Sequence, residues 1–334
     1  MADIKFRRDL NSLIRHPVRK RLRTPALRSP IDGGVGIAEE GDDIVPINEG
    51  VYVRHYGGGI TNNDVYFYDA YGAAPVNISN AGVRGGLGVV DGDIYACSAS
   101  NGSIYKNGSS IKTNSYSGGP WFAAGSSDLI VEEANSGYFA YLHTLAGVYT
   151  STTNLPYSFE SSTILSANDE VIAYIDAGAG PERMRLADRS GTSLMTPHDY
   201  ANTFFINSVA CNKSASVFAD APWDGSENII TLHVFNNAGT LIGEHALAAG
   251  SVAALGGHLS VLGMSENRIY LVGASASQQK VLIYDHTLTI NGAGLATNST
   301  IGSLLYTVNT PQSSSNWTYK DGYQEACMDS IRFA

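Results

Sequence analysis

Along most of the chain, short apolar or alternating runs are separated by turns rich in glycine, asparagine and serine. Such runs, bounded by such turns, are typical of β-strands and not of long amphipathic helices. In six places a run ends in a polar residue at a turn. In four of the six, a glycine follows within three residues. These marker residues are Asp69, Asn107, Thr150, Asp188, Asn236 and Asp285, spaced 38 to 49 residues apart.

A second strand-like run precedes each marker, so the runs occur in pairs. The preceding runs are 51–53, 94–96, 138–141, 171–174, 216–219 and 269–272. Paired runs joined by tight turns predict hairpins, and a repeat of roughly forty to fifty residues is the length of a four-stranded propeller blade. The sequence therefore predicts an all-β fold, a six- or seven-bladed β-propeller over residues 33–334. A solenoid is the competing architecture, although its repeats are usually shorter and more regular.

The two ends of this β-rich region are expected to meet. Strand-like runs remain after the last marker, at 304–308 and 331–333. An unclosed ring of sheets leaves unpaired backbone groups at an edge, so one blade usually takes strands from both ends of the chain. We therefore expect segment 43–46 to pair with the C-terminal strand.

Residues 1–32 follow a different pattern and predict a separate arm. Apolar residues recur at helical spacing from Phe6 to Ile14, Asp3 can cap that helix, and Pro17 should end it. Three prolines between arginines then predict an extended segment without a core of its own. The arm is thus expected to be extended or partly helical.

Charge separates the arm from the rest of the chain. Residues 1–30 carry nine basic and two acidic residues, a net charge of +7. Positions 31–334 then hold 12 basic and 29 acidic residues, a net charge of −17. Only 16% of all residues are charged, whereas 36 are glycine and 19 tyrosine, a balance that also favours many short strands.

The arm is the best candidate for a binding segment. Its cations can contact nucleic-acid phosphates, or its arginines and apolar stripe can enter an acidic groove on a protein partner. We favour the protein partner because nucleic-acid tails usually lack a spaced apolar stripe; a disordered solubilising tail remains the plain alternative. The candidate partner-binding residues are Phe6, Arg7, Arg8, Leu10, Leu13, Arg15, Arg19, Lys20, Arg21, Arg23 and Arg28.

No motif in the sequence indicates catalysis, a metal or a cofactor. The three cysteines are far apart and the eight histidines show no close ligand pairing, so we expect buried free thiols and structural or surface histidines. The acid-rich turn 220–227 resembles an oxygen-rich calcium loop but does not have EF-hand spacing. There is no apolar run of eighteen residues and no signal peptide, which predicts synthesis in the cytoplasm without membrane insertion.

In general form the chain resembles virion proteins of tailed bacteriophages. The resemblance rests on the basic anchor 7–15, the Gly-, Ser-, Thr-, Asn- and Tyr-rich body, and repeats without an enzyme signature. It implies a non-enzymatic protein of the virion, whose arm docks on capsid, portal or tail proteins. The acidic propeller would project outward, decorating the particle or contacting a host-surface glycan. The alternative is a carbohydrate-active propeller that binds or cleaves glycans.

Overall fold

The computed structural model describes sixteen segments of the chain. They are residues 50–54, 64–69, 76–80, 87–90, 93–97, 103–113, 121–124, 128–132, 139–155, 165–176, 183–199, 208–221, 229–255, 258–274, 280–309 and 326–328. Almost all of these residues lie in strands or tight turns, which confirms the all-β prediction. The predicted arm, with all its candidate binding residues, lies outside these segments.

Within the described residues, the strands form six four-stranded antiparallel sheets, numbered here in chain order. The first sheet contains β24 (Ala326–Met328), β1 (Gly50–Arg54), β2 (Asp64–Asp69) and β3 (Val76–Asn80). The second contains β4 (Leu87–Val90), β5 (Asp93–Cys97), β6 (Ile104–Lys106) and β7 (Ser109–Lys112). The third contains β8 (Trp121–Ala124), β9 (Asp128–Glu132), β10 (Phe139–Thr144) and β11 (Tyr149–Asn154).

The remaining three sheets follow the same order of strands. The fourth contains β12 (Leu165–Ala167), β13 (Val171–Asp176), β14 (Arg183–Asp188) and β15 (His198–Asp199). The fifth contains β16 (Ser208–Cys211), β17 (Ala215–Asp220), β18 (Thr231–Asn236) and β19 (Leu241–Ala246). The sixth contains β20 (His258–Met264), β21 (Arg268–Ala274), β22 (Lys280–Ile290) and β23 (Ala296–Asn309), and the short helix α2 (Ser251–Ala254) precedes it.

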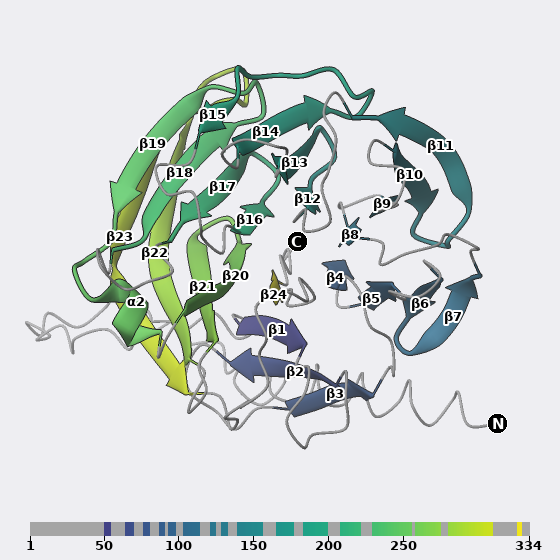
Figure 1. The fold of residues 1–334 in the computed structure, drawn as a ribbon, viewed down its shortest axis with the longest axis horizontal. Helices are drawn as coiled ribbons and strands as arrows, with labels where there is room; N and C mark the ends of the chain where they lie inside the picture. The colour runs from purple at the N-terminus through teal and green to yellow at the C-terminus, as the bar shows by residue number, and fades with distance from the viewer. Residues whose placement is uncertain are drawn as a thin grey trace, which may run out of the picture. The chain divides into compact units, whose positions relative to one another are not determined.

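The first strand of each sheet contacts the first strand of the next. These contacts join β24, β4, β8, β12, β16 and β20 in that order, and β20 in turn contacts β24. Figure 1 shows these strands nearest a common centre, with the last strand of each sheet farthest from it. The chain therefore runs outward through each sheet and returns inward to begin the next.

Alternate residues of one strand pack into two different cores. On β13, Val171, Ala173 and Ile175 join a cluster with residues of the fifth sheet. Ile172 and Tyr174, between them in sequence, join a cluster with residues of the third sheet. The fourth sheet is thus buried on both faces, and each of its buried valine and isoleucine side chains contributes roughly 1.5–3 kcal/mol through burial.

The two ends of the β-rich region share the first sheet, as the sequence predicts. Strand β24 pairs with β1, so that Val51 lies opposite Met328 and Val53 opposite Ala326. The pairing strands are therefore β24 and β1, whereas the predicted segments 43–46 and 331–333 lie outside the described residues.

Two of the six markers were misplaced. Strand β10 ends at Thr144, so Thr150 lies one strand later, in β11. The turn was missed because threonine replaces Asp or Asn there: Thr144 Oγ1 accepts the Val148 N–H at 3.2 Å. Asp285 lies within β22, and that strand turns only at Asn291, which explains why no glycine follows Asp285.

Candidate functional site

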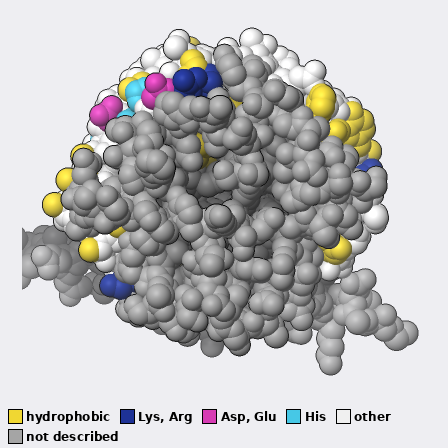
Figure 2. Space-filling model, viewed as in Figure 1, with side chains coloured by type: hydrophobic (Ala, Val, Ile, Leu, Met, Phe, Trp, Pro, Cys, Tyr) yellow, Lys and Arg dark blue, Asp and Glu magenta, His cyan; other side chains and the backbone are white. Residues whose placement is uncertain are grey.

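The outer hairpin of the sixth sheet is the longest in the described part of the chain. Strands β22 and β23 have 11 and 14 residues, whereas the outer strands of the other sheets have at most six. Three large apolar side chains on this hairpin are exposed: Ile290 (46%), Leu304 (42%) and Leu305 (37%). Leu241 on the neighbouring β19 is 39% exposed. Figure 2 shows hydrophobic side chains along the edge where Figure 1 places β19 and β23.

A groove of about 660 Å³ lies between β19, the segment containing α2, and β23. Leu247, Ile301 and Leu304 contribute apolar surface, and Glu244 and His245 contribute polar groups. Burial lowers the pKa of His245, so this imidazole is a neutral donor or acceptor at pH 7. The groove thus offers an apolar floor with polar groups at its edge, a combination common in protein and ligand binding sites.

A second, polar pocket of about 310 Å³ lies where turns of the fourth, fifth and sixth sheets meet. Glu170, Lys213 and Asn237 line it, and the Asn237 amide donates to Glu170 Oε2 at 2.8 Å. Below it, the Asn168 amide donates to the Asn212 carbonyl at 2.7 Å. The Asn212 amide donates in turn to the Ser265 carbonyl at 2.9 Å, so three successive sheets are joined by side-chain amides.

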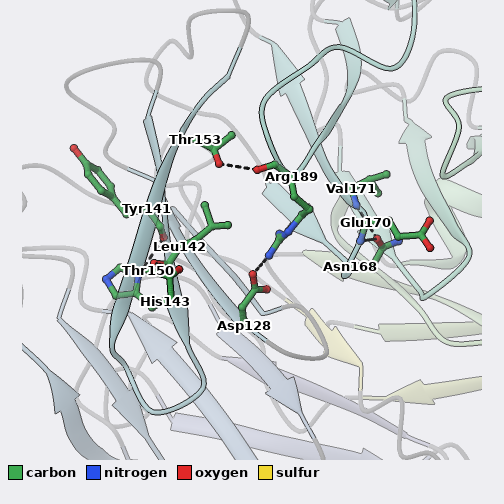
Figure 3. A network of polar contacts seen from close by, with 10 residues as sticks. All are labelled: Asp128, Tyr141, Leu142, His143, Thr150, Thr153, Asn168, Glu170, Val171 and Arg189. Atoms are coloured by element: carbon green, nitrogen blue, oxygen red, sulfur yellow. Dashed lines mark hydrogen bonds and ion pairs between the residues drawn. The ribbon is translucent and has the colours of Figure 1, made fainter.

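A hydrogen bond and an ion pair also connect the third and fourth sheets (Figure 3). Arg189 forms an ion pair with Asp128, and the Arg189 carbonyl accepts the Thr153 hydroxyl at 2.8 Å. Burial lowers the pKa of Arg189 to about 10, which still leaves the guanidinium charged at neutral pH. These contacts join the third and fourth sheets, as the side-chain amides join the fourth, fifth and sixth.

Two histidines and a glutamate come together between the fourth and fifth sheets. His198 lies on β15, His233 on β18 and Glu244 on β19, and their potential ligand atoms all lie within 4.8 Å of one another. These three residues are the only set of this kind in the segments that the structure describes. In Figure 2, histidine and acidic side chains lie together where Figure 1 places β15 and β19.

Sequence reasoning missed this cluster because His198 comes from a different sheet. Two of its three residues could have been placed together from the sequence. The turn after Asn236 places His233 directly opposite Glu244 in the β18–β19 hairpin. The position of His198 depends on packing between sheets, for which the sequence carries no local signal.

The other candidates from the sequence are only partly described. Cys211 is a free thiol, as predicted, and burial raises its pKa to about 11. Of the predicted calcium turn, the structure describes Asp220 and Ala221 but not residues 222–228. In the described segments, no helix is both long enough and apolar enough to cross a membrane.

Comparison with known proteins identifies the type of fold. No protein-family model and no curated protein matches the sequence. Among solved structures, a chain in the crystal structure of a nidogen/laminin complex is similar with a TM-score of 0.53 and 9% identity, over 86% of this chain and 100% of that one. TolB from Acinetobacter baumannii follows with a TM-score of 0.49 and 10% identity, over 84% of this chain and 66% of that one. The chain of the nidogen/laminin complex has a β-propeller-type fold, and at such low identity the similarity concerns the fold alone. The chain therefore has a β-propeller-type fold.

Proposed function

We propose that this chain is a non-catalytic binding and assembly protein. Its basic arm, residues 1–32, docks on a larger assembly, and the outer surface of its fifth and sixth sheets binds a protein partner. The observation that carries the proposal is the long β22–β23 hairpin, which has three exposed apolar side chains, one of which, Leu304, lines the groove of about 660 Å³. The setting we propose, a tailed-bacteriophage virion, rests on the sequence resemblance alone.

The physical argument begins with the exposed apolar side chains. Single exposed leucines are ordinary, but several exposed apolar side chains on one hairpin, one of them in a groove, are typical of interaction surfaces. Leu304 both lines the groove and is 42% exposed, so a partner side chain seated there would remove it from water. Interfaces are usually anchored by a few such central apolar contacts.

The opposite charges of the two parts of the chain support separate roles. Residues 1–30 carry a net charge of +7 and positions 31–334 a net charge of −17, so an acidic partner would attract the first part and repel the second. We also propose that the six sheets are the six blades of one ring, closed by β24. The cyclic contacts between the first strands support this arrangement.

The test uses particles purified from the native source and four forms of the protein. We expect the full-length chain to sediment with the particles and a chain starting at Ile31 to remain in the supernatant. A full-length Leu304→Asp variant should still sediment but lose the partner bound by the propeller, detected by crosslinking and mass spectrometry. The matched control is Val148→Asp, which also places a carboxylate at an exposed apolar site, 60% exposed, but on the third sheet.

Two results would contradict the proposal. If the chain starting at Ile31 sediments as well as the full-length chain, the arm is not the anchor. If Leu304→Asp and Val148→Asp give the same crosslinks as the unaltered protein, the sixth sheet is not the binding surface.

A further inference from the structure

We propose that His198, His233 and Glu244 form a binding site for a divalent transition-metal ion of the zinc class, located where the fourth and fifth sheets meet. The proposal is independent of the function proposed above. It rests on the placement of the three side chains, on a buried nitrogen without a hydrogen-bond partner, and on the ligand preferences of metal ions.

The three side chains converge from three strands. His233 and Glu244 are directly opposite each other in the β18–β19 pairing, with His233 Nδ1 3.6 Å from a Glu244 carboxylate oxygen. His198 reaches them from β15 in the preceding sheet, and its ring centroid lies 5.0 Å from that of His233. Phe235, whose ring centroid lies 5.9 Å from that of His198, flanks the imidazole on the fifth sheet.

His233 supplies the second observation. It is only 7% exposed, and its Nδ1 atom is buried without a hydrogen-bond partner among the described residues. At 3.6 Å, the contact with Glu244 is too long for a hydrogen bond. A buried imidazole nitrogen and a carboxylate oxygen that face each other at this distance, without a bond between them, are well placed to share a cation.

The donor set selects the class of ion. Two imidazoles and one carboxylate suit zinc and similar ions, whereas calcium and magnesium prefer oxygen ligands alone. In a tetrahedral zinc site, bond lengths near 2.0–2.2 Å place neighbouring ligand atoms about 3.4 Å apart. The 3.6 Å separation already matches this spacing, and small side-chain rotations would bring the third ligand in from within 4.8 Å.

The position of the site suggests what the ion would do. Strand β15 has only two residues and pairs only with β14. An ion bound by His198 on β15 and by two residues of the fifth sheet would link this short strand to the fifth sheet. Because Glu244 is exposed, with 59% of its side chain accessible, the fourth coordination position would be open to water.

The test measures zinc binding by the full-length protein after treatment with a chelator. Isothermal titration calorimetry with zinc chloride should show one ion per chain, and zinc should raise the melting temperature. Cobalt(II) should give the strong visible absorption typical of a four- or five-coordinate ion. His198→Asn and Glu244→Gln should each weaken zinc binding by at least about tenfold and remove the rise in melting temperature. These two residues are chosen because both lie nearer the surface than His233.

Two control variants test whether zinc binding depends specifically on the proposed ligands. Glu266→Gln removes another half-exposed carboxylate of similar accessibility, one that pairs with Lys213. His245→Asn removes a neighbouring histidine that lies outside the proposed ligand set. Both should bind zinc like the unaltered protein, and calcium and magnesium should not compete. The proposal is overturned if zinc does not bind, if His198→Asn binds zinc normally, or if His245→Asn abolishes binding.

Discussion

Three histidines in the described segments have nearly inaccessible side chains: His143 (0% exposed), His233 (7%) and His286 (1%). Each lies on the third strand of its sheet and interacts with a side chain from the last strand of the preceding sheet. The partners are Lys112 for His143, His198 for His233, and His245 for His286. Burial lowers the pKa of all three, and a nearby cation or imidazole adds to the effect, so these histidines are neutral at pH 7.

Stability should therefore fall as the solution becomes acidic. Burial and the neighbouring His245 lower the pKa of His286 to about 4 from 6.5, while the nearby Asp285 opposes this. Between pH 6.5 and 4 the unfolded chain binds a proton that the folded chain does not, so the free energy of unfolding decreases as pH falls through this range. For His286 alone the decrease is on the order of 3 kcal/mol.

The measurement is the urea midpoint at several pH values between 7.5 and 4.5. A His286→Gln variant, which can still form a hydrogen bond with Ser299, should show a shallower decline than the unaltered protein. If the two proteins decline in parallel, His286 is not a source of the acid sensitivity.

At the level of elements, one turn recurs in the outer hairpins. In each copy a glycine N–H donates to the carbonyl of the residue three positions earlier, at 2.8–3.0 Å, and the glycine φ is between +78° and +91°. The copies begin at Thr144, Asp188, Asn236 and Asn291. In the three with an Asp or Asn, the side-chain oxygen also accepts two backbone N–H groups of the turn.

The turn glycine also touches the preceding sheet. A Cβ on Gly191 would overlap the carbonyl oxygen of Asn154, and a Cβ on Gly239 would overlap that of Leu194. Gly294, in the last copy, has nothing within 4 Å of the same position. Glycine is therefore required at these turns for backbone conformation in every case, and for close packing in only some of them.

This difference gives a matched pair of substitutions. Gly294→Ala should cost roughly 1–2 kcal/mol, because alanine is strained at positive φ. Gly239→Ala should cost a further 1–3 kcal/mol, roughly, because the added methyl group is forced into the fourth sheet. Chemical denaturation of both variants measures how much free energy of unfolding each one loses. Equal losses would show that the turn at Gly239 is not tightly packed against the fourth sheet.

These turns also explain how far the sequence could predict the structure. The pattern of Asp or Asn followed by glycine is local, so Asp188 and Asn236 were placed correctly at the ends of their strands. Prediction failed at Thr150 and Asp285, where a threonine replaced the usual residue or the hairpin continued beyond the expected length. Contacts between sheets, including those of His198, have no local pattern and could not be predicted in this way.

At the level of the whole molecule, the described residues depend on a strand supplied from far along the chain. Strand β24 covers the edge of β1 and contacts the first strands of both neighbouring sheets. Without it, β1 would expose unpaired backbone groups, which promote aggregation.

A chain ending at Asn309, which lacks β24, should therefore aggregate and lose cooperative unfolding. The control is a chain ending at Met328, which keeps β24 and removes only the six residues after it. Light scattering and thermal unfolding of the two proteins give the comparison. A monomeric chain ending at Asn309 with an unchanged melting temperature would show that β24 is dispensable.

The open tip of the β22–β23 hairpin also determines where this chain can accept new residues. At the turns containing Gly191 and Gly239, any insertion must displace the adjoining sheet. At Asn291–Gly294 no atom of the described residues lies within 4 Å of a Cβ placed on either glycine, so a foreign peptide inserted there should disturb the described sheets least. For the same reason, the β22–β23 hairpin could change in length while the strands of the other sheets keep their lengths.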